Sequence, residues 1–192
     1  IGPTVGTDAG WGYGVHVENA TKVTVSNNLI RECTRHSIYL ARAAKHSEIS
    51  IRNNLILDHD AAAKQPRWYC AALACARSSG VTIAGNLIVN PRTIAISVEP
   101  DEYMGWPTED VSLFSNRVLN SRRVGIWVTT GGSCNAMANA VTLDPSPPDP
   151  QWCRQMSTYD YARGKKTESS IAAPLENWKY ARHTAALGGK LF

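Results

Sequence analysis

The stretch Val23-Thr-Val-Ser-Asn-Asn-Leu-Ile30 decides the fold, because the chain repeats it. Near-copies lie at residues 49–56, 81–88 and 111–118, and a more divergent copy lies at residues 134–141. The same asparagine position is filled in every copy, at steps of 26, 32, 30 and 23 residues: Asn28, Asn54, Asn86, Asn116 and Asn139. Self-similarity at a period of about 20 to 50 residues is typical of a solenoid.

Each copy alternates aliphatic residues with small polar ones. A period of two predicts a strand with one buried face. The asparagine then ends the strand, since its short side chain tolerates the left-handed backbone region. A second strand signal precedes each copy, at residues 15–17, 38–40, 73–75, 94–96 and 126–128. We therefore expect each coil to contain a strand, a short turn, a second strand, an asparagine corner, a short third strand and a loop of variable length.

Coils of this length resemble the right-handed parallel β-helices of pectate-lyase-like proteins, over roughly residues 12 to 143. The resemblance implies an all-β, right-handed parallel β-helix of about five coils. Stacked coils place equivalent residues about 4.8 Å apart. We therefore expect the five asparagines to form a ladder inside the corner, in which each amide bonds the next. We interpret these residues as structural.

The chain divides into a predicted β-helix domain at 1–143 and a C-terminal extension at 144–192. The extension opens with a Pro-rich linker, and prolines cannot continue a central strand. From about Pro174 the pattern predicts a short helix that ends at Gly188-Gly189 and caps or packs along the solenoid. The alternative is an arm that binds a partner. Because the chain starts at Ile1 without an initiator Met, we interpret it as a fragment or a processed chain, with homo-oligomer formation through an uncapped N-terminal coil as one expectation.

Charge and cysteine content exclude few function classes. The net charge of +4 comes from the C-terminal part, since residues 1–153 carry 13 basic and 13 acidic residues while 154–192 carry seven and three. This modest excess gives no reason to expect a nucleic-acid partner, and no apolar run is long enough for a membrane span. The five cysteines leave at least one unpaired; Cys134 with Cys153 is one candidate pair, and Cys75 fits a core position.

Two connections, 57–70 and 97–110, are longer than their equivalents and leave different corners of neighbouring coils. We expect them to form the walls of a groove across one sheet. Their aromatic residues can stack on sugar rings: Trp68, Tyr69, Tyr103 and Trp106. Their polar residues can bond hydroxyls or charges: Asp58, His59, Asp60, Lys64, Arg67, Glu99, Asp101 and Glu102. The alternative is that both loops fold back and close the coil.

The first strand of each coil adds a floor to this groove. We expect one outward column of His16, Tyr39, Ala74, Ala95 and Trp127, with large residues at its ends and a shallow trough between them. Basic residues of the second coil flank this column: Arg35, His36, Arg42, Lys45 and His46. A basic, aromatic trough suits an anionic glycan, although each basic residue alone also fits an ordinary solvated turn.

The reaction depends on which groups are used. A lyase needs a base beside the uronate carboxylate and a cation to neutralise it, for which the candidates are Arg67, Lys64, Arg42 and His36. A hydrolase needs two carboxylates about 5–10 Å apart, for which the candidates are Asp58, Asp60, Glu99 and Asp101. The Asp58-His59-Asp60 sequence is a weak Ca²⁺ signal, and we expect no other metal or cofactor. The chain contains no nucleophile elbow, P-loop or zinc-protease motif.

The leading interpretation is a carbohydrate-active protein, a polysaccharide lyase or glycoside hydrolase, acting on an acidic polysaccharide. The alternative is a non-catalytic β-helix, either a glycan-binding or a tailspike-like structural module. The fold resemblance favours an extracellular or periplasmic location. No catalytic motif of a particular lyase family can be placed on these residues, so the resemblance carries over no catalytic residue.

Overall fold

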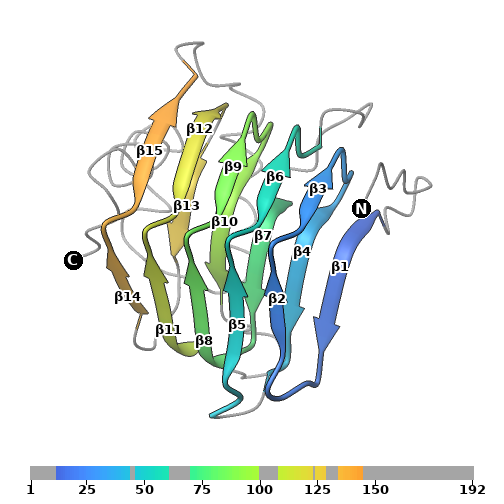
Figure 1. Ribbon diagram of the computed structural model, residues 1–192, viewed down its shortest axis with the longest axis vertical. Coiled ribbons are helices and arrows are strands. Elements are labelled where there is room, and N and C mark those ends of the chain that lie inside the picture. The colour runs from blue at the N-terminus through green and yellow to red at the C-terminus, as the bar shows by residue number, and fades with distance from the viewer. Residues whose placement is uncertain are drawn as a thin grey trace, which may run out of the picture.

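The computed structural model describes residues 12–43, 46–60, 70–99, 108–122, 124–128 and 134–144. Its strands form three five-stranded sheets, and every strand pairs in parallel with its equivalent in the next coil. Figure 1 shows the coils stacked side by side, with the second and third sheets toward the viewer and the first sheet behind. This arrangement confirms the predicted parallel β-helix.

The strands of each sheet follow the order of the coils. The first sheet contains β1 (Tyr13–Glu18), β4 (His36–Ala41), β7 (Ala71–Ala76), β10 (Ile94–Glu99) and β13 (Val124–Val128). The second contains β2 (Thr24–Ser26), β5 (Ile49–Arg52), β8 (Ser79–Ala84), β11 (Glu109–Phe114) and β14 (Cys134–Met137). The third contains β3 (Leu29–Arg31), β6 (Leu55–Leu57), β9 (Leu87–Val89), β12 (Arg117–Ser121) and β15 (Ala140–Leu143).

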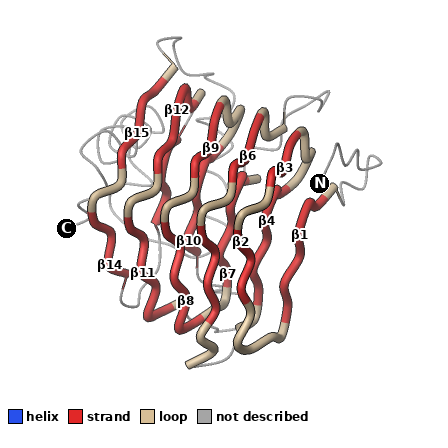
Figure 2. The backbone as a smooth tube through the Cα atoms, in the orientation of Figure 1, coloured by secondary structure: helices blue, strands red, loops and turns tan. Residues whose placement is uncertain are grey.

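The asparagine corner joins the second sheet to the third, and Figure 2 shows these corners as short tan segments between red strands. There the side-chain amides form the predicted ladder. The nitrogen of Asn28 donates to the oxygen of Asn54 over 3.0 Å, and the next steps measure 3.0, 3.0 and 2.9 Å. Each oxygen also accepts the backbone N–H of the preceding asparagine. The ladder thus satisfies polar groups that the corner buries.

The first-sheet strands depart from simple alternation. Ala72 and Ala95 pack in the main core together with their aliphatic successors, whereas Ala71 and Ile94 belong to a separate outer cluster. A side chain at Gly14, the equivalent position of β1, would also meet interior atoms of Ile30 and Cys33. Each strand therefore directs two consecutive residues inward, a small one and then an aliphatic one.

This double inward step corrects the predicted outer column. The register pairs His16 with Tyr39, Tyr39 with Ala74, Ala74 with Ser97 and Ser97 with Trp127. Ser97 therefore occupies the place predicted for Ala95, which points into the core. The prediction failed because it assumed simple alternation and therefore assigned Ala95, which lies between Ile94 and Ile96, to the outer face. The double inward step reverses that assignment.

The remaining predictions for this part concern the ends of the chain. The extension from residue 145 onward, with its predicted linker and helix, lies outside the described residues, as do residues 1–11. Within the described residues, no helix has the length and hydropathy that a membrane-spanning segment requires.

Candidate functional site

Four rings gather on the outer face of the first sheet at its N-terminal edge. Tyr13 and His16 come from β1, and His36 and Tyr39 come from β4. Their centroids lie 4.9 to 5.7 Å apart, and the planes of neighbouring rings differ by 10° to 33°. We call these four residues the ring cluster.

The strand pattern explains why the rings meet. In each strand the two rings are three residues apart, and the double inward step lies between them, so both rings point outward. The register pairs Tyr13 with His36 and His16 with Tyr39 across the two coils. Tyr13 was not among the residues predicted from the sequence; its signal was the same spacing of aromatic or imidazole rings in two successive coils.

Charged side chains surround the ring cluster. The guanidinium of Arg35 lies 5.2 Å from the ring centre of Tyr13, within cation–π range. At the other end of the strands, Arg42 forms an ion pair with Glu18 at 2.9 Å, and a ring nitrogen of His16 lies 3.5 Å from Glu18. The face therefore combines ring surface with guanidinium groups.

Tyr39 contacts each of the other three rings. Burial raises the pKa of its hydroxyl, nearby Arg77 and Arg35 oppose that rise, and Glu99 and Glu18 add to it. The hydroxyl is therefore protonated at neutral pH and can donate a hydrogen bond.

The two buried histidines differ in position. Burial lowers the pKa of His36 to about 3, and its Nδ1 lies 3.0 Å from the carbonyl oxygen and 3.1 Å from the nitrogen of Ala71. Burial, aided by His36, lowers the pKa of His59 to about 3. The Nδ1 of His59 lies 3.3 Å from the hydroxyl of Ser37, a residue at an inward position of β4. Both imidazoles are neutral at pH 7, and His59 has no exposed surface with which to contact a polysaccharide.

The middle of the first-sheet face is not an open trough. Ala74 and Ser97 are 2% and 0% exposed, and Ala74 belongs to an outer apolar cluster against which Tyr39 and Trp127 pack. The accessible part of this face thus lies toward β1 and β4. Trp127 remains at the far end of the column, on β13.

The structure separates the acidic candidates that it describes. Asp58 and Asp60 lie in the corner after β6, between the third and first sheets, and Asp60 is fully buried. Glu99 ends β10 at the opposite end of the first-sheet strands. Seven further predicted site residues lie outside the described residues: Lys64, Arg67, Trp68, Tyr69, Asp101, Tyr103 and Trp106. Glu102, of the second long connection, lies outside them as well.

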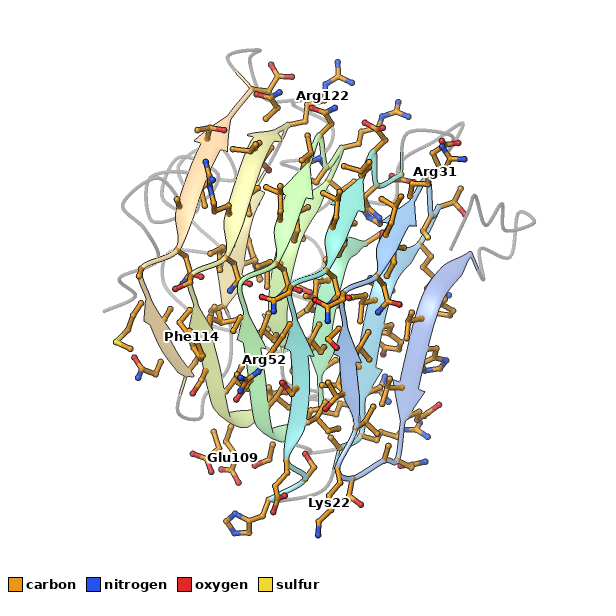
Figure 3. The ribbon with its side chains drawn as sticks, viewed as in Figure 1. Lys22, Arg31, Arg52, Glu109, Phe114 and Arg122 are labelled. Carbon is orange, nitrogen blue, oxygen red and sulfur yellow. The ribbon has the colours of Figure 1, made fainter. Side chains whose placement is uncertain are left out.

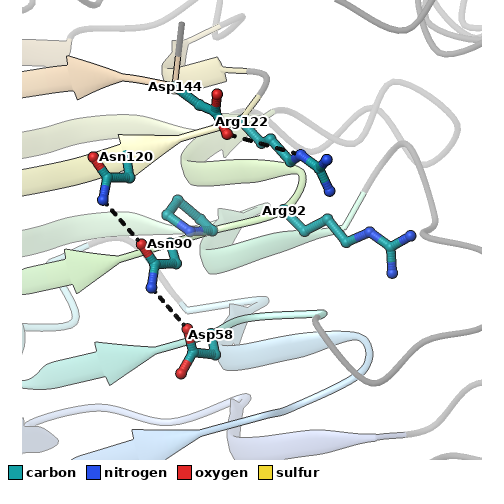
Figure 4. A pocket seen from close by; sticks show the side chains of 7 residues that line it. Asp58, Asn90, Arg92, Asn120, Arg122 and Asp144 are labelled. Carbon is teal, nitrogen blue, oxygen red and sulfur yellow. Dashed lines mark hydrogen bonds and ion pairs between the residues drawn. The ribbon is translucent and has the colours of Figure 1, made fainter. Parts of the chain in front are cut away.

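A second polar feature lies in the corner of Asp58. A hollow of about 540 Å³, which we call the corner hollow, is lined by Asp58, Asn90, Pro91, Arg92, Asn120, Arg122 and Asp144. Figure 4 shows its amides in a row, with the two arginines projecting beside them. The sequence signal for this row is an acid or amide three residues after the first residue of the third-sheet strand: Glu32, Asp58, Asn90 and Asn120. These four residues share a positive φ of 50° to 56°.

No group of three or more His, Cys, Asp or Glu side chains in the described part of the chain is arranged to hold a metal ion. The Ca²⁺ signal of Asp58-His59-Asp60 therefore gains no support from these residues, because His59 and Asp60 are buried while Asp58 bonds Asn90 in the row outside.

Comparison with known proteins adds one finding. Residues 7–141 match the family model described as a right-handed beta helix region. No curated protein and no solved structure gave a significant match.

Proposed function

The chain belongs to the right-handed β-helix family, and from this premise we propose that it is a carbohydrate-active protein that acts on an acidic polysaccharide. We place the polysaccharide along the outer face of the first sheet, at the ring cluster. The fold itself supports many functions, so the proposal depends on this site.

The observation that carries the proposal is the combination of rings and guanidinium groups on one face. Apolar and aromatic surface with a few placed polar groups is typical of a small-molecule or sugar subsite. Arg35 lies against Tyr13, and Arg42 lies at the strand end beside Glu18. Arginine is well suited to bind carboxylates, because its planar guanidinium can donate two parallel hydrogen bonds. A uronate unit offers both a ring and a carboxylate.

Among the described residues, the geometry favours elimination over hydrolysis. The register aligns Glu18, Ala41, Ala76 and Glu99 across four coils. Glu18 and Glu99 are therefore three strand spacings apart, about 14 Å, which exceeds the roughly 5–10 Å of a hydrolase pair. A lyase needs no such pair: a base removes the proton next to the uronate carboxylate, a carbon–carbon double bond forms, and the bond to the leaving glycosidic oxygen breaks.

In this proposal Arg42 neutralises the uronate carboxylate. Lys64 and Arg67 are the candidates for the base, which requires the connection that carries them, residues 61–69, to extend along the first-sheet strands toward Arg42. His36 is a poor base for this step, since its pKa is about 3. Glu18 already pairs with Arg42, so an incoming carboxylate would compete with it for the guanidinium.

One observation favours a second candidate, the non-catalytic glycan-binding or tailspike-like module. The described ionisable candidates do not converge: His36 lies in the ring cluster, Asp58 in the corner hollow and Glu99 at the far strand end. A binding module uses the same face without chemistry, and a solution mass well above one chain would favour its tailspike-like form.

The test is incubation of the full chain with uronate-containing and neutral polysaccharides, reading unsaturated-product absorbance and new reducing ends in parallel. We expect unsaturated product from an acidic polymer, and its loss in Arg42→Gln. The matched control is Arg52→Gln, which removes an arginine from the outer face of the second sheet (Figure 3). Reducing ends without unsaturation would replace elimination with hydrolysis. Binding without either product would support the non-catalytic module. The absence of both binding and product would refute the proposal.

A further inference from the structure

We propose that the corner hollow is a second binding site, separate from the ring cluster, and that it takes a sugar acid: a small hydroxylated molecule with one carboxylate. The hollow lies at the junction of the third and first sheets, whereas the ring cluster lies on the first-sheet face at β1 and β4. The inference therefore stands apart from the function proposed for that face.

The row of amides in the hollow has a direction. The side-chain nitrogen of Asn120 donates to the oxygen of Asn90 over 3.2 Å, and the nitrogen of Asn90 donates to Oδ1 of Asp58 over 2.9 Å. The row therefore runs from the later coils toward a carboxylate that accepts the last hydrogen bond. All three residues are on the outside of the corner, in contrast to the buried ladder of Asn54 and its equivalents.

The row keeps hydrogen-bonding capacity for a ligand. An amide group has two N–H bonds and a carboxylate has two oxygens. Within the described part of the chain, the row engages one N–H and the oxygen of Asn90, one N–H of Asn120 and one oxygen of Asp58. The remaining donors and acceptors can bind neighbouring hydroxyls of a sugar, and successive coils repeat them about every 4.8 Å.

The arginines add the recognition of an anion. Backbone hydrogen bonds of the corner place Arg92 above His59 and Arg122 above Pro91, so the two arginines occupy equivalent positions in successive coils. Arg122 is half-exposed, and its Nε lies 3.9 Å from a carboxylate oxygen of Asp144, a separation at which the pair is weak. A ligand carboxylate can therefore approach the guanidinium of Arg122 from the solvent side.

The charge balance selects the kind of anion. Two arginines and two aspartates, Asp58 and Asp144, leave the hollow with no formal net charge. A dianionic phosphate ester would meet more repulsion from these aspartates than a carboxylate with a single charge. The volume of about 540 Å³ falls within the range of small-molecule sites. Together these features favour a sugar acid over a sugar phosphate or a neutral sugar.

The experiment is calorimetric titration of the full chain with glucuronate, glucose, acetate and glucose 6-phosphate. We expect glucuronate to bind more tightly than the other three, because only it combines hydroxyls with a single carboxylate. Arg122→Gln should weaken glucuronate binding about tenfold or more, the effect of losing one hydrogen bond to a charged group. Asn120→Gly should weaken it as well, and glycine accepts the positive φ of 54° at that position.

Two controls separate this site from the rest of the molecule. Arg52→Gln should leave glucuronate binding unchanged. Loss of glucuronate binding in Arg42→Gln, with binding intact in Arg122→Gln, would move the site to the ring cluster and overturn the inference. Equal binding of acetate, equal or tighter binding of glucose 6-phosphate, or the absence of saturable glucuronate binding would each overturn it too. Thermal unfolding of every variant shows whether a loss of binding reflects a loss of fold.

Discussion

The side-chain oxygen of Asn86 accepts two hydrogen bonds from Asn54 on the preceding coil, one from the side-chain nitrogen and one from the backbone nitrogen, both over 3.0 Å. The side-chain nitrogen of Asn86 in turn donates to the carbonyl oxygen of Ile51 and to the side-chain oxygen of Asn116. One side chain thus satisfies polar groups of three coils.

Replacing Asn86 with alanine should be strongly destabilising. The substitution removes the acceptor of two buried N–H groups of Asn54 and the side-chain donor to the carbonyl oxygen of Ile51, while Asn116 keeps only the backbone N–H of residue 86. We therefore expect a loss of about 3 kcal/mol or more in the free energy of unfolding. Denaturant unfolding of the variant measures it. Asn135→Ala, at an exposed position of β14, is the control and should change stability by less than about 0.5 kcal/mol.

The position in the ladder provides an internal comparison. Asn28 donates to Asn54 but accepts no ladder hydrogen bond within the described residues. Asn28→Ala should therefore cost less than Asn86→Ala. Equal losses at the two positions would show that the ladder contributes little beyond local corner geometry.

The buried histidines predict a loss of stability in acid. In the unfolded chain a histidine binds a proton near pH 6.5, whereas His36 and His59 in the folded chain bind one only near pH 3. Between these pH values the unfolded state holds more protons, so the free energy of unfolding falls as the pH falls. Each histidine contributes a slope of up to about 1.4 kcal/mol per pH unit.

Urea unfolding between pH 8 and pH 5 tests this prediction. The pH dependence should be shallower in His59→Gln, which keeps a polar side chain but cannot take up the proton. His46→Gln, at an exposed position between β4 and β5, should keep the slope of the unaltered chain. If His59→Gln also keeps that slope, His59 is not held neutral by the fold.

The double inward step of the first-sheet strands predicts intolerance at Gly14. An added Cβ would lie 2.5 Å from the carbonyl oxygen of Ser37, 2.8 Å from Cγ2 of Ile30 and 2.9 Å from Sγ of Cys33. Gly14→Ala should therefore destabilise the chain by about 1–3 kcal/mol through overpacking. An unchanged unfolding midpoint would mean that the coil around Gly14 can shift to accommodate the added methyl group. Thr24→Ala, on the outer face of β2, is the exposed control.

The repeated elements of the fold could be predicted from the sequence because the same physical requirement recurs in every coil. Each corner needs a short side chain that can hydrogen-bond to the equivalent side chain of the next coil. The recurrence of asparagine at Asn28 and its equivalents made this requirement visible in the sequence. The assignment of Ala95 to the outer face failed because strand alternation alone does not reveal two successive inward residues. The small residue at the first of them, as in Gly14 and Ala72, was the available signal.

The candidate site was predicted less completely than the fold. Sequence reasoning placed Tyr39 and Trp127 in one outward column, and the register confirms that placement. It did not foresee that the middle of that column is buried, because burial of Ser97 depends on tertiary packing. It grouped Asp58 with Glu99 as members of one groove between connections that leave different corners, but the sequence does not reveal that these two residues lie at opposite ends of the first-sheet strands.

A salt dependence follows from the charges of the first-sheet face. If guanidinium groups near the ring cluster bind uronate carboxylates, raising the ionic strength should weaken binding of an acidic polysaccharide, since salt screens exposed charges. Measuring the dissociation constant at several salt concentrations tests this. A dissociation constant that does not change with salt would point to stacking on the rings alone.

The most direct test of the central claim is affinity electrophoresis of the native chain in gels that contain either polygalacturonate or a neutral glucan. The account predicts retardation by the acidic polymer alone, with reduced retardation in His16→Gln and Arg42→Gln and normal retardation in Arg52→Gln. Equal mobility in all gels, or retardation that His16→Gln and Arg42→Gln leave intact, would contradict the claim that the ring cluster binds an acidic polysaccharide.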